Sequence, residues 1–266
     1  MEDIVLRVSL VQYDIVWEDK DANLNYVESK IKELAGHTDV VALPEMFSTG
    51  FSMNSRDLAE PVQGKTISTL KRWAAEYDIA ICGSYIAKED DNYYNRGFFI
   101  TPREEYYYDK RHLFRMSNES QSFSAGEKKL IVEHKGFHIC LLICYDLRFP
   151  VWARNVGNEY DILIYVANWP ASRMKVWNAL LPARALENMA CVCGVNRIGT
   201  DGNGLKYTGG SKMINAMGDE VLSLSPAAEQ IGTVSVSKNE LERFRTKFPV
   251  WKDADKFEIK STVDSK

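Results

Sequence analysis

Two short segments that are apolar along their whole length constrain the fold most strongly. Ile139–Ile143 and Ile162–Val166 contain no charged residue. A strand with one face in water alternates apolar and polar residues, whereas a strand covered on both faces is apolar throughout. The two segments therefore predict strands in the middle of a sheet that other layers cover on both sides. Such strands are typical of the α/β class.

Strand-like and helix-like segments alternate along the rest of the 266 residues. Apolar or β-branched runs predict strands over Val5–Tyr13, Val40–Leu43, Ile79–Ile86, Gly97–Thr101, Glu105–Tyr108, Phe137–Ile143, Asp161–Ala167, Ala190–Asn196, Ser211–Asn215 and Gly232–Val236. Helical spacing predicts helices over Asn23–Ala35, Thr66–Tyr77 and Trp177–Asn188, and the start of another over Trp152–Asn155. No shift in composition marks a boundary, so we expect a single domain over residues 1–266.

Composition narrows the possible partners. The net charge of -4, from 33 basic and 37 acidic residues, argues against a general nucleic-acid binder. The start Met1-Glu2-Asp3 is acidic and no apolar run approaches about 18 residues, so we expect neither a secretory signal nor a membrane span. The five cysteines include no CxxC pair, which favours free thiols in the cytoplasm.

Three residues with reactive side chains follow apolar or aromatic segments. Cys144 comes directly after the expected strand ending at Ile143, Glu45 follows Leu43-Pro44, and Lys110 follows the Tyr106–Asp109 segment. A thiol, a carboxylate and an ammonium are a complete set for acyl transfer from an amide. This chemistry requires a base for the thiol, a partner for the oxyanion and a proton for the leaving ammonia.

The three side chains divide these tasks. No histidine closely follows Cys144, so the carboxylate of Glu45 is the available base. Lys110 is expected to favour the thiolate and to donate to the oxyanion. The backbone N–H of Tyr145 would be a second oxyanion donor, because a turn or helix start leaves N–H groups free.

The three segments together resemble the motifs of the nitrilase superfamily of carbon–nitrogen hydrolases. The matching motifs are Leu43-Pro44-Glu45, Asp109–Phe114 and Ile143–Pro150, and the resemblance covers nearly the whole chain. It implies a four-layer αββα sandwich in which Glu45, Lys110 and Cys144 are catalytic. It also implies that Glu119 positions the substrate and the lysine. We expect no cofactor and no metal.

Within the superfamily the chain resembles the bacterial omega-amidases, or 2-oxoglutaramate amidases. Further matches lie at Val166–Pro170, Pro182–Asn188, Gly194–Arg197, Asp201–Gly204 and Lys247–Asp255. The resemblance implies hydrolysis of 2-oxoglutaramate or 2-oxosuccinamate to the 2-oxo acid and ammonia through a cysteine thioester, in a homodimer. Another amide, ureido acid or nitrile as substrate remains an alternative, as does a binding protein without activity. Apolar residues in the tail, about 247–266, predict packing at a subunit interface.

A 2-oxo acid substrate carries a carboxylate, which an arginine or a hydroxyl binds well. Arg148, Arg173 and Tyr145 are the candidates, and Arg148 is equally consistent with an ion pair to Asp146 or a helix end. The apolar wall of the pocket is expected from Phe51, Trp169 and Trp177. His134 and His138, interpreted as lying on one strand, lack a third metal ligand and are interpreted as surface residues.

Overall fold

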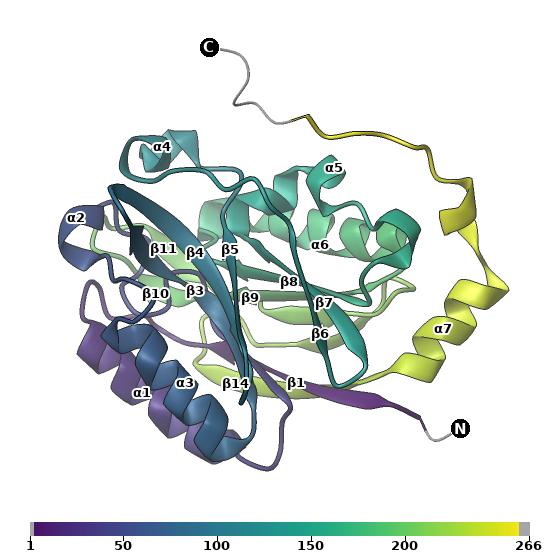
Figure 1. The fold of residues 1–266 in the computed structure, drawn as a ribbon, viewed down its shortest axis with the longest axis horizontal. Helices are drawn as coiled ribbons and strands as arrows, with labels where there is room; N and C mark the ends of the chain where they lie inside the picture. The colour runs from purple at the N-terminus through teal and green to yellow at the C-terminus, as the bar shows by residue number, and fades with distance from the viewer. Residues whose placement is uncertain (1–2, 261–266) are drawn as a thin grey trace.

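Two six-stranded sheets pack face to face, and helices cover the outer face of each sheet (Figure 1). The computed structural model describes residues 3–260. The strand orders are β14-β1-β2-β3-β4-β5 and β13-β12-β9-β8-β7-β6. The layers therefore follow the order α-β-β-α, which confirms the predicted sandwich.

The first sheet combines the strands from the amino-terminal half with one late strand. Its members are β1 (Val5–Gln12), β2 (Val40–Ala42), β3 (Ala80–Glu89), β4 (Asn92–Ile100), β5 (Glu105–Asp109) and β14 (Gln230–Ser237). Helices α1 (Lys20–Leu34) and α3 (Lys65–Tyr77) cover its outer face. Alternate residues of β2 serve the two faces: Val40 and Ala42 pack between the sheets, whereas Val41 packs under the helices.

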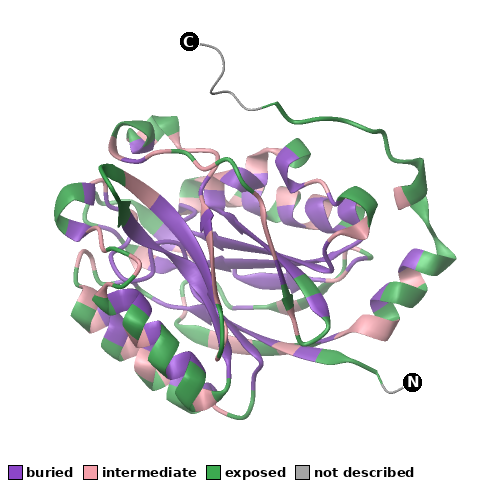
Figure 2. Cartoon of the chain, in the orientation of Figure 1, coloured by how far each residue is buried: buried purple, intermediate pink, exposed green. Residues whose placement is uncertain are grey.

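The second sheet contains the two segments that are apolar throughout. Its strands are β6 (Leu130–His134), β7 (Phe137–Ile143), β8 (Ile162–Ala167), β9 (Cys191–Asn196), β12 (Lys212–Ile214) and β13 (Glu220–Ser223). Strands β7, β8 and β9 are parallel, and α5 (Pro150–Ala153) and α6 (Met174–Asn188) lie over them. Every residue of β8 is buried, as its apolar sequence predicted (Figure 2).

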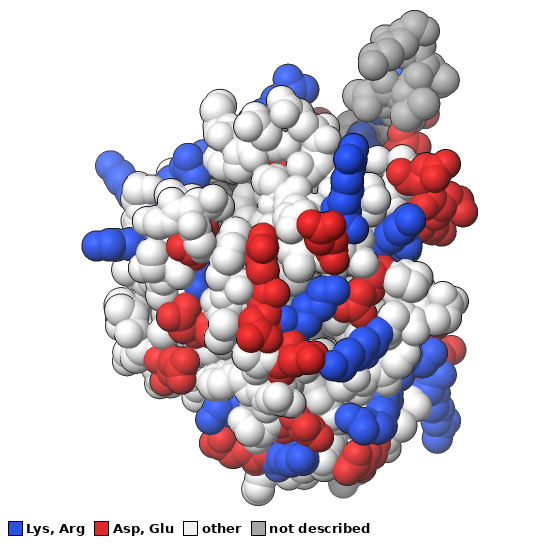
Figure 3. All heavy atoms as spheres, turned by 90° about the vertical axis from the view of Figure 1, so that its left-hand side faces the viewer, with Lys and Arg blue, Asp and Glu red and all other residues white. Residues whose placement is uncertain are grey.

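Shorter elements surround the ends of the sheets. Helices α2 (Ser55–Leu58) and α4 (Glu119–Ser122) and the ribbon of β10 (Ile198–Thr200) with β11 (Lys206–Thr208) lie on the left in Figure 1. Acidic and basic side chains are interspersed on that side of the molecule (Figure 3). In the stretch from residue 3 to 260, no helix combines the length and the apolar character needed to cross a membrane.

Several elements differ from the prediction. Strand β4 begins at Asn92 rather than Gly97, because the polar residues before Gly97 read as a loop although Asn95 is fully buried. His134 and His138 do not share a strand: His134 ends β6 and His138 lies on β7, across a tight hairpin. Helix α7 (Lys238–Lys247) was not predicted, because Leu241 and Arg245 are its only buried residues and leave little apolar periodicity.

The segment after α7 follows the outside of the molecule. A short 3-10 helix, Val250–Asp253, leads into an exposed strand-free stretch that runs to residue 260 (right in Figure 1). Four apolar side chains are exposed there: Phe248, Val250, Phe257 and Ile259. The expected subunit contact of this segment remains a prediction.

Candidate active site

The predicted reactive residues meet where strands of both sheets end. Cys144 directly follows β7, Lys110 directly follows β5, and Glu45 lies three residues beyond β2. The carboxyl ends of β2 and of the parallel strands β7 and β8 open at the same edge of the sandwich, because Glu45, beyond β2, accepts from the N–H of Asn168, directly after β8. The fold thus brings together three residues that lie far apart in the sequence.

Lys110 stands between two carboxylates. Its Nζ donates to Glu45 Oε1 at 2.8 Å and to both oxygens of Glu119 at 3.0 Å. All three side chains have no solvent exposure. Glu119 begins α4 and therefore occupies the position beside the lysine that the resemblance implied. Burial alone would lower the pKa of Lys110, but Glu119, Glu45 and Cys144 outweigh it and raise that pKa above its usual value. Lys110 is therefore charged.

Asn95, in the middle of β4, is a site residue that the sequence pattern did not single out. Its Nδ2 donates to Glu45 Oε1 at 2.8 Å and to Glu119 Oε1 at 3.0 Å. Ser84 Oγ donates to Asn95 Oδ1 at 2.9 Å. The sequence gives little signal for Asn95, because asparagine is depleted in strands and the expected strand began two residues later.

Asn168 directly follows β8 and was also missed. Its backbone N–H donates to Glu45 Oε2 at 2.9 Å, and its side-chain Nδ2 donates to the carbonyl oxygen of Glu45 at 2.5 Å. The thiol of Cys144 lies 3.9 Å from the carbonyl oxygen of Asn168. Asn168 lies in the Val166–Pro170 motif, where a polar residue after a buried strand was the available signal.

Cys144 occupies a strained turn. Its φ is 43°, in the left-handed region that a residue with a side chain adopts at a cost of about 1–3 kcal/mol. Asp146 fixes this turn, because its carboxylate accepts from the Ile143 N–H at 3.0 Å, the Tyr108 hydroxyl at 2.7 Å and the His112 N–H at 3.1 Å. One buried carboxylate thus joins the turn at Cys144 to the segment that carries Lys110.

The surroundings of Cys144 favour its neutral thiol. Burial is the largest influence and raises the pKa of Cys144 well above its usual value, and Glu45 and Glu119 raise it further. Lys110 lowers the pKa of this thiol but does not outweigh these effects. Lys110 therefore acts in the expected direction, but burial has the larger influence on this thiol. A proton must leave the sulfur before or during attack, so a base beside it is required.

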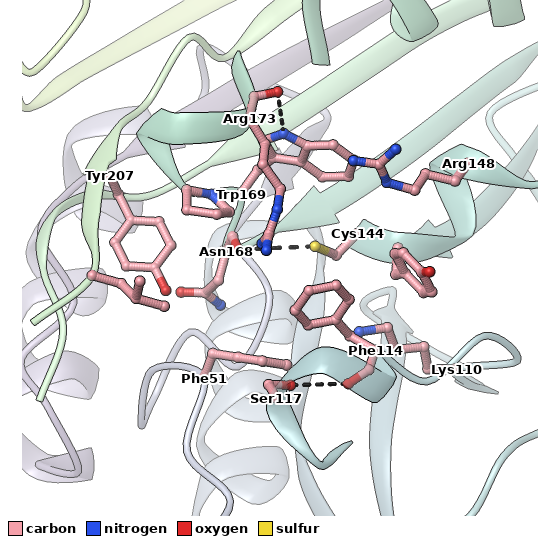
Figure 4. Close-up of a pocket in the computed structure, with 13 residues that line it drawn as sticks. Phe51, Lys110, Phe114, Ser117, Cys144, Arg148, Asn168, Trp169, Arg173 and Tyr207 are labelled. Carbon is pink, nitrogen blue, oxygen red and sulfur yellow. Dashed lines mark hydrogen bonds between the residues drawn. The ribbon is translucent and has the colours of Figure 1, made fainter. Parts of the chain in front are cut away.

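A pocket opens in front of the sulfur (Figure 4). Its walls are mainly aromatic or apolar, with Lys110 and Cys144 at its base, and are formed by Phe51, Phe114, Ser117, Tyr145, Arg148, Asn168, Trp169, Pro170, Arg173, Leu205 and Tyr207. All four residues proposed to bind the substrate, Tyr145, Arg148, Trp169 and Arg173, line it. Trp177 does not: it is buried in the core, where its Nε1 donates to the carbonyl oxygen of Gly210 at 2.9 Å.

Two guanidinium groups border the pocket without a carboxylate partner. Arg148 lies 5.3 Å from the ring centre of Trp169, and Arg173 lies 4.8 Å from that of Phe114. Among residues 3–260 neither arginine forms a salt bridge. The alternative ion pair of Arg148 with Asp146 is wrong, because hydrogen bonds from other groups occupy that carboxylate.

Metal chemistry finds no support in the described part of the chain. Within it, no three His, Cys, Asp or Glu side chains gather in a way that could hold a metal ion. The reactive groups at the pocket are the thiol, the two carboxylates, the ammonium and the backbone N–H groups around Cys144.

Comparison with known proteins agrees with this arrangement. The family model for carbon-nitrogen hydrolases matches residues 7–246. This chain therefore belongs to the carbon-nitrogen hydrolase family, as its resemblance to the nitrilase superfamily indicated. The match includes all the site residues described above.

Individual relatives are similar over nearly the full length. The chain is 41% identical to omega-amidase YafV of Escherichia coli (strain K12), over 96% of this chain and 98% of that protein. It is 31% identical to the 2-oxoglutaramate amidase of Bacillus subtilis (strain 168), over 94% of this chain and 97% of that protein. Among solved structures, XC1258 from Xanthomonas campestris, a CN-hydrolase superfamily protein with an arsenic adduct in its active site, superposes with a TM-score of 0.94. It is 40% identical, and the match covers 98% of this chain and 100% of XC1258.

Proposed function

We propose that this protein is an omega-amidase that hydrolyses the terminal amide of 2-oxoglutaramate or 2-oxosuccinamate to the 2-oxo acid and ammonia. The observation that carries the proposal is the thiol of Cys144 at the base of a pocket bordered by Arg148 and Arg173. The thiol suits attack on an amide, and an unpaired guanidinium suits the carboxylate at the other end of the substrate. The similarity to omega-amidases and to a 2-oxoglutaramate amidase supports the choice.

The proposed reaction begins with proton transfer from the Cys144 thiol to Glu45, while the sulfur attacks the amide carbon. Lys110 and the Tyr145 N–H stabilise the oxyanion. Tyr145 is the second residue of the 3-10 helix Cys144–Arg148, where backbone N–H groups have no partner within the helix. Lys110 retains a proton for this task, because one Nζ–H can be shared between both oxygens of Glu119.

The tetrahedral intermediate collapses by breaking the carbon–nitrogen bond, and Glu45 returns its proton to the leaving nitrogen, which departs as ammonia. A thioester on Cys144 remains. Glu45 then takes a proton from water as the hydroxyl attacks the thioester carbon, and the thiolate recovers that proton when the 2-oxo acid leaves. Atoms and protons balance over the two half-reactions, and the enzyme returns to its resting state.

The test is ammonia release from a panel of 2-oxo acid amides, aliphatic amides, ureido acids and nitriles. We expect 2-oxo acid amides to be preferred by about 100-fold or more in kcat/KM, and Cys144→Ala to abolish their hydrolysis. Cys191→Ala is the control, because Cys191 is also buried, with a pKa raised to about 11 by burial, but lies outside the pocket. Ammonia release by Cys144→Ala would contradict the proposal. If a ureido acid or a nitrile were the preferred substrate, the proposed substrate class would be wrong.

We further propose that the protein is a cytoplasmic homodimer whose subunits meet near the carboxyl-terminal segment. All five cysteines are free thiols, which suits a reducing compartment. Phe248, Val250, Phe257 and Ile259 expose apolar surface that a second copy would cover. Light scattering on the full chain and on a chain ending at Arg245 tests this: we expect a dimer and a monomer, respectively. If both chains formed particles with the same number of subunits, the proposed contact through the carboxyl-terminal segment would be contradicted.

A further inference from the structure

The hydrogen bonds around the two buried carboxylates are unequally distributed. An ionised carboxylate offers about four acceptor positions, two on each oxygen. Glu119 fills all of its positions: Oε1 accepts from Lys110 and Asn95, and Oε2 accepts from Lys110 and from the backbone N–H of Phe114. Glu119 therefore has no acceptor position left for another proton donor.

Glu45 fills three of its four positions. Its Oε1 accepts from Lys110 and Asn95, at 2.8 Å each, whereas its Oε2 accepts only from the Asn168 N–H, at 2.9 Å, within the described hydrogen bonds. One acceptor position on Oε2 therefore remains open for the thiol proton of Cys144. The sulfur of Cys144 also lies beside Asn168, 3.9 Å from its carbonyl oxygen.

Asn95 occupies one acceptor position on each carboxylate, and hydrogen bonds through Ser84 fix the orientation of its amide. Ser84 Oγ accepts from the backbone N–H of Met46 at 2.8 Å, and its own proton donates to Asn95 Oδ1 at 2.9 Å. A flipped amide would place Oδ1 against both carboxylates and its NH2 group against Ser84. The chain Met46–Ser84–Asn95 therefore directs both Nδ2 protons at Glu45 and Glu119.

We infer that Asn95 is a positioning residue that leaves Glu45 Oε2 as the one carboxylate oxygen free to take the thiol proton. It does so by filling the Oε1 position on both glutamates, and Ser84 acts through it. The inference rests on the proposed role of Glu45 as base and adds the reason why Glu119, which touches the same ammonium, is not that base.

Asn95 donates to both carboxylates, and for Glu119 this hydrogen bond favours the charged form. Burial raises the pKa of Glu119, with Glu45 raising it further, whereas Lys110, the Phe114 N–H and Asn95 lower it. Loss of a hydrogen-bond donor favours the protonated form of a carboxylate. A protonated glutamate cannot act as a base. As the solution is acidified, a protein without the Asn95 amide should therefore lose activity at a higher pH than the unmodified protein does.

The experiment compares the pH dependence of four variants of the full-length protein. Asn95→Ala removes the amide, Asn95→Asp replaces both donors with a third carboxylate of the same shape, and Ser84→Ala releases the amide without removing it. Asn155→Ala is the matched control, because buried Asn155 also donates two Nδ2 hydrogen bonds, to Tyr160 and Asn188, away from the pocket.

Two readouts are measured from pH 4 to pH 9: kcat/KM for 2-oxoglutaramate, and the rate at which iodoacetamide alkylates Cys144, followed by peptide mass spectrometry. We expect the acidic midpoint of both profiles to rise by about one pH unit in Asn95→Ala, by more in Asn95→Asp and by less in Ser84→Ala, with no shift in Asn155→Ala. The alkylation profile needs no substrate, so it tests the inference even if the proposed substrate is wrong.

A purely structural role for Asn95 would lower the melting temperature and kcat without moving either midpoint. Unshifted midpoints in Asn95→Ala, or equal shifts in Asn95→Ala and Asn155→Ala, would overturn the inference. If both Asn95 variants fail to fold, Ser84→Ala decides alone: a raised midpoint supports the inference, and an unchanged midpoint overturns it.

Discussion

Two groups of buried charges in this protein are built in opposite ways. At Asp161, beside α7, one carboxylate meets two cations: Arg245 donates to Oδ1 at 2.8 Å, and Lys238 donates to Oδ2 at 2.5 Å. The His138 N–H adds a further donor to Oδ2 at 2.9 Å. At the pocket, two carboxylates share the single ammonium of Lys110, and a neutral amide supplies the missing donors.

The difference separates stability from chemistry. Arg245 also donates to the carbonyl oxygens of Met189 and Tyr160, so the Asp161 group has an excess of cations and holds α7 to the second sheet. The pocket group keeps an excess carboxylate, an open acceptor position and a thiol beside it. Two cations keep one carboxylate ionised, whereas one of two carboxylates that share a single cation can accept a proton.

The largest expected effect is a loss of activity when the pocket group loses its base. Glu45→Gln keeps the size of the side chain but removes the base, so we expect kcat/KM for 2-oxo acid amides to fall by about 10³- to 10⁴-fold. Steady-state kinetics on the full-length protein measures it. Glu133→Gln, on the exposed side of β6, is the control and should match the unmodified protein. If the Glu45→Gln protein kept more than a tenth of the kcat/KM of the unmodified protein, Glu45 would not be the base, and the contrast between the pocket and the Asp161 group would fail.

The next effect is on folding. Arg245→Met leaves the buried Asp161 short of a partner, so we expect the free energy of unfolding to fall by about 3 kcal/mol. Urea denaturation measures the change, and kcat at 20 °C should be unaffected. Arg243→Met, exposed on the same helix, should change the free energy of unfolding by less than about 0.5 kcal/mol. A stable Arg245→Met protein with reduced kcat would link α7 to the pocket instead.

A smaller effect concerns substrate binding. Arg173→Gln and Arg148→Gln each remove a guanidinium that lacks a carboxylate partner, so their loss should weaken binding of a carboxylate-bearing substrate. We expect KM to rise by about 10- to 100-fold for the arginine that contacts the carboxylate, with little change in kcat. A neutral amide of the same length is the control substrate. Equal losses on both substrates would show that the arginine supports the pocket rather than the carboxylate.

The smallest effect measures strain at the nucleophile. Glycine adopts a positive φ without the steric cost that a Cβ imposes, so Cys144→Gly should be more stable than Cys144→Ala by about 1 kcal/mol. Both variants should lack activity, which makes the pair a test of backbone strain alone. Thermal denaturation of the two proteins gives the difference, and a less stable glycine variant would mean that the turn at Cys144 is relaxed.

The sequence predicted Cys144 and Lys110, which directly follow strands, but missed Asn168, which also follows one, and Asn95, which lies within one. Cys144 and Lys110 were found because a reactive side chain after an apolar or aromatic strand is conspicuous. Asn95 was missed because it lies in a polar stretch that reads as a turn, and its partners Glu45 and Glu119 are 50 and 24 residues away. No local pattern records such distant contacts.

The sequence by itself determined most of the central strands, because apolar periodicity is a local property of the chain. Through the resemblance to the nitrilase superfamily, its motifs also implied the layered sandwich and the three motif residues. Only the tertiary structure decided that the surroundings of Cys144 favour a neutral thiol, that two arginines border the pocket unpaired, and that one oxygen of Glu45 remains open. The physical reason is that pKa values and hydrogen-bond saturation depend on which groups share a buried space. Here the packing of several strand ends against one another defines that space.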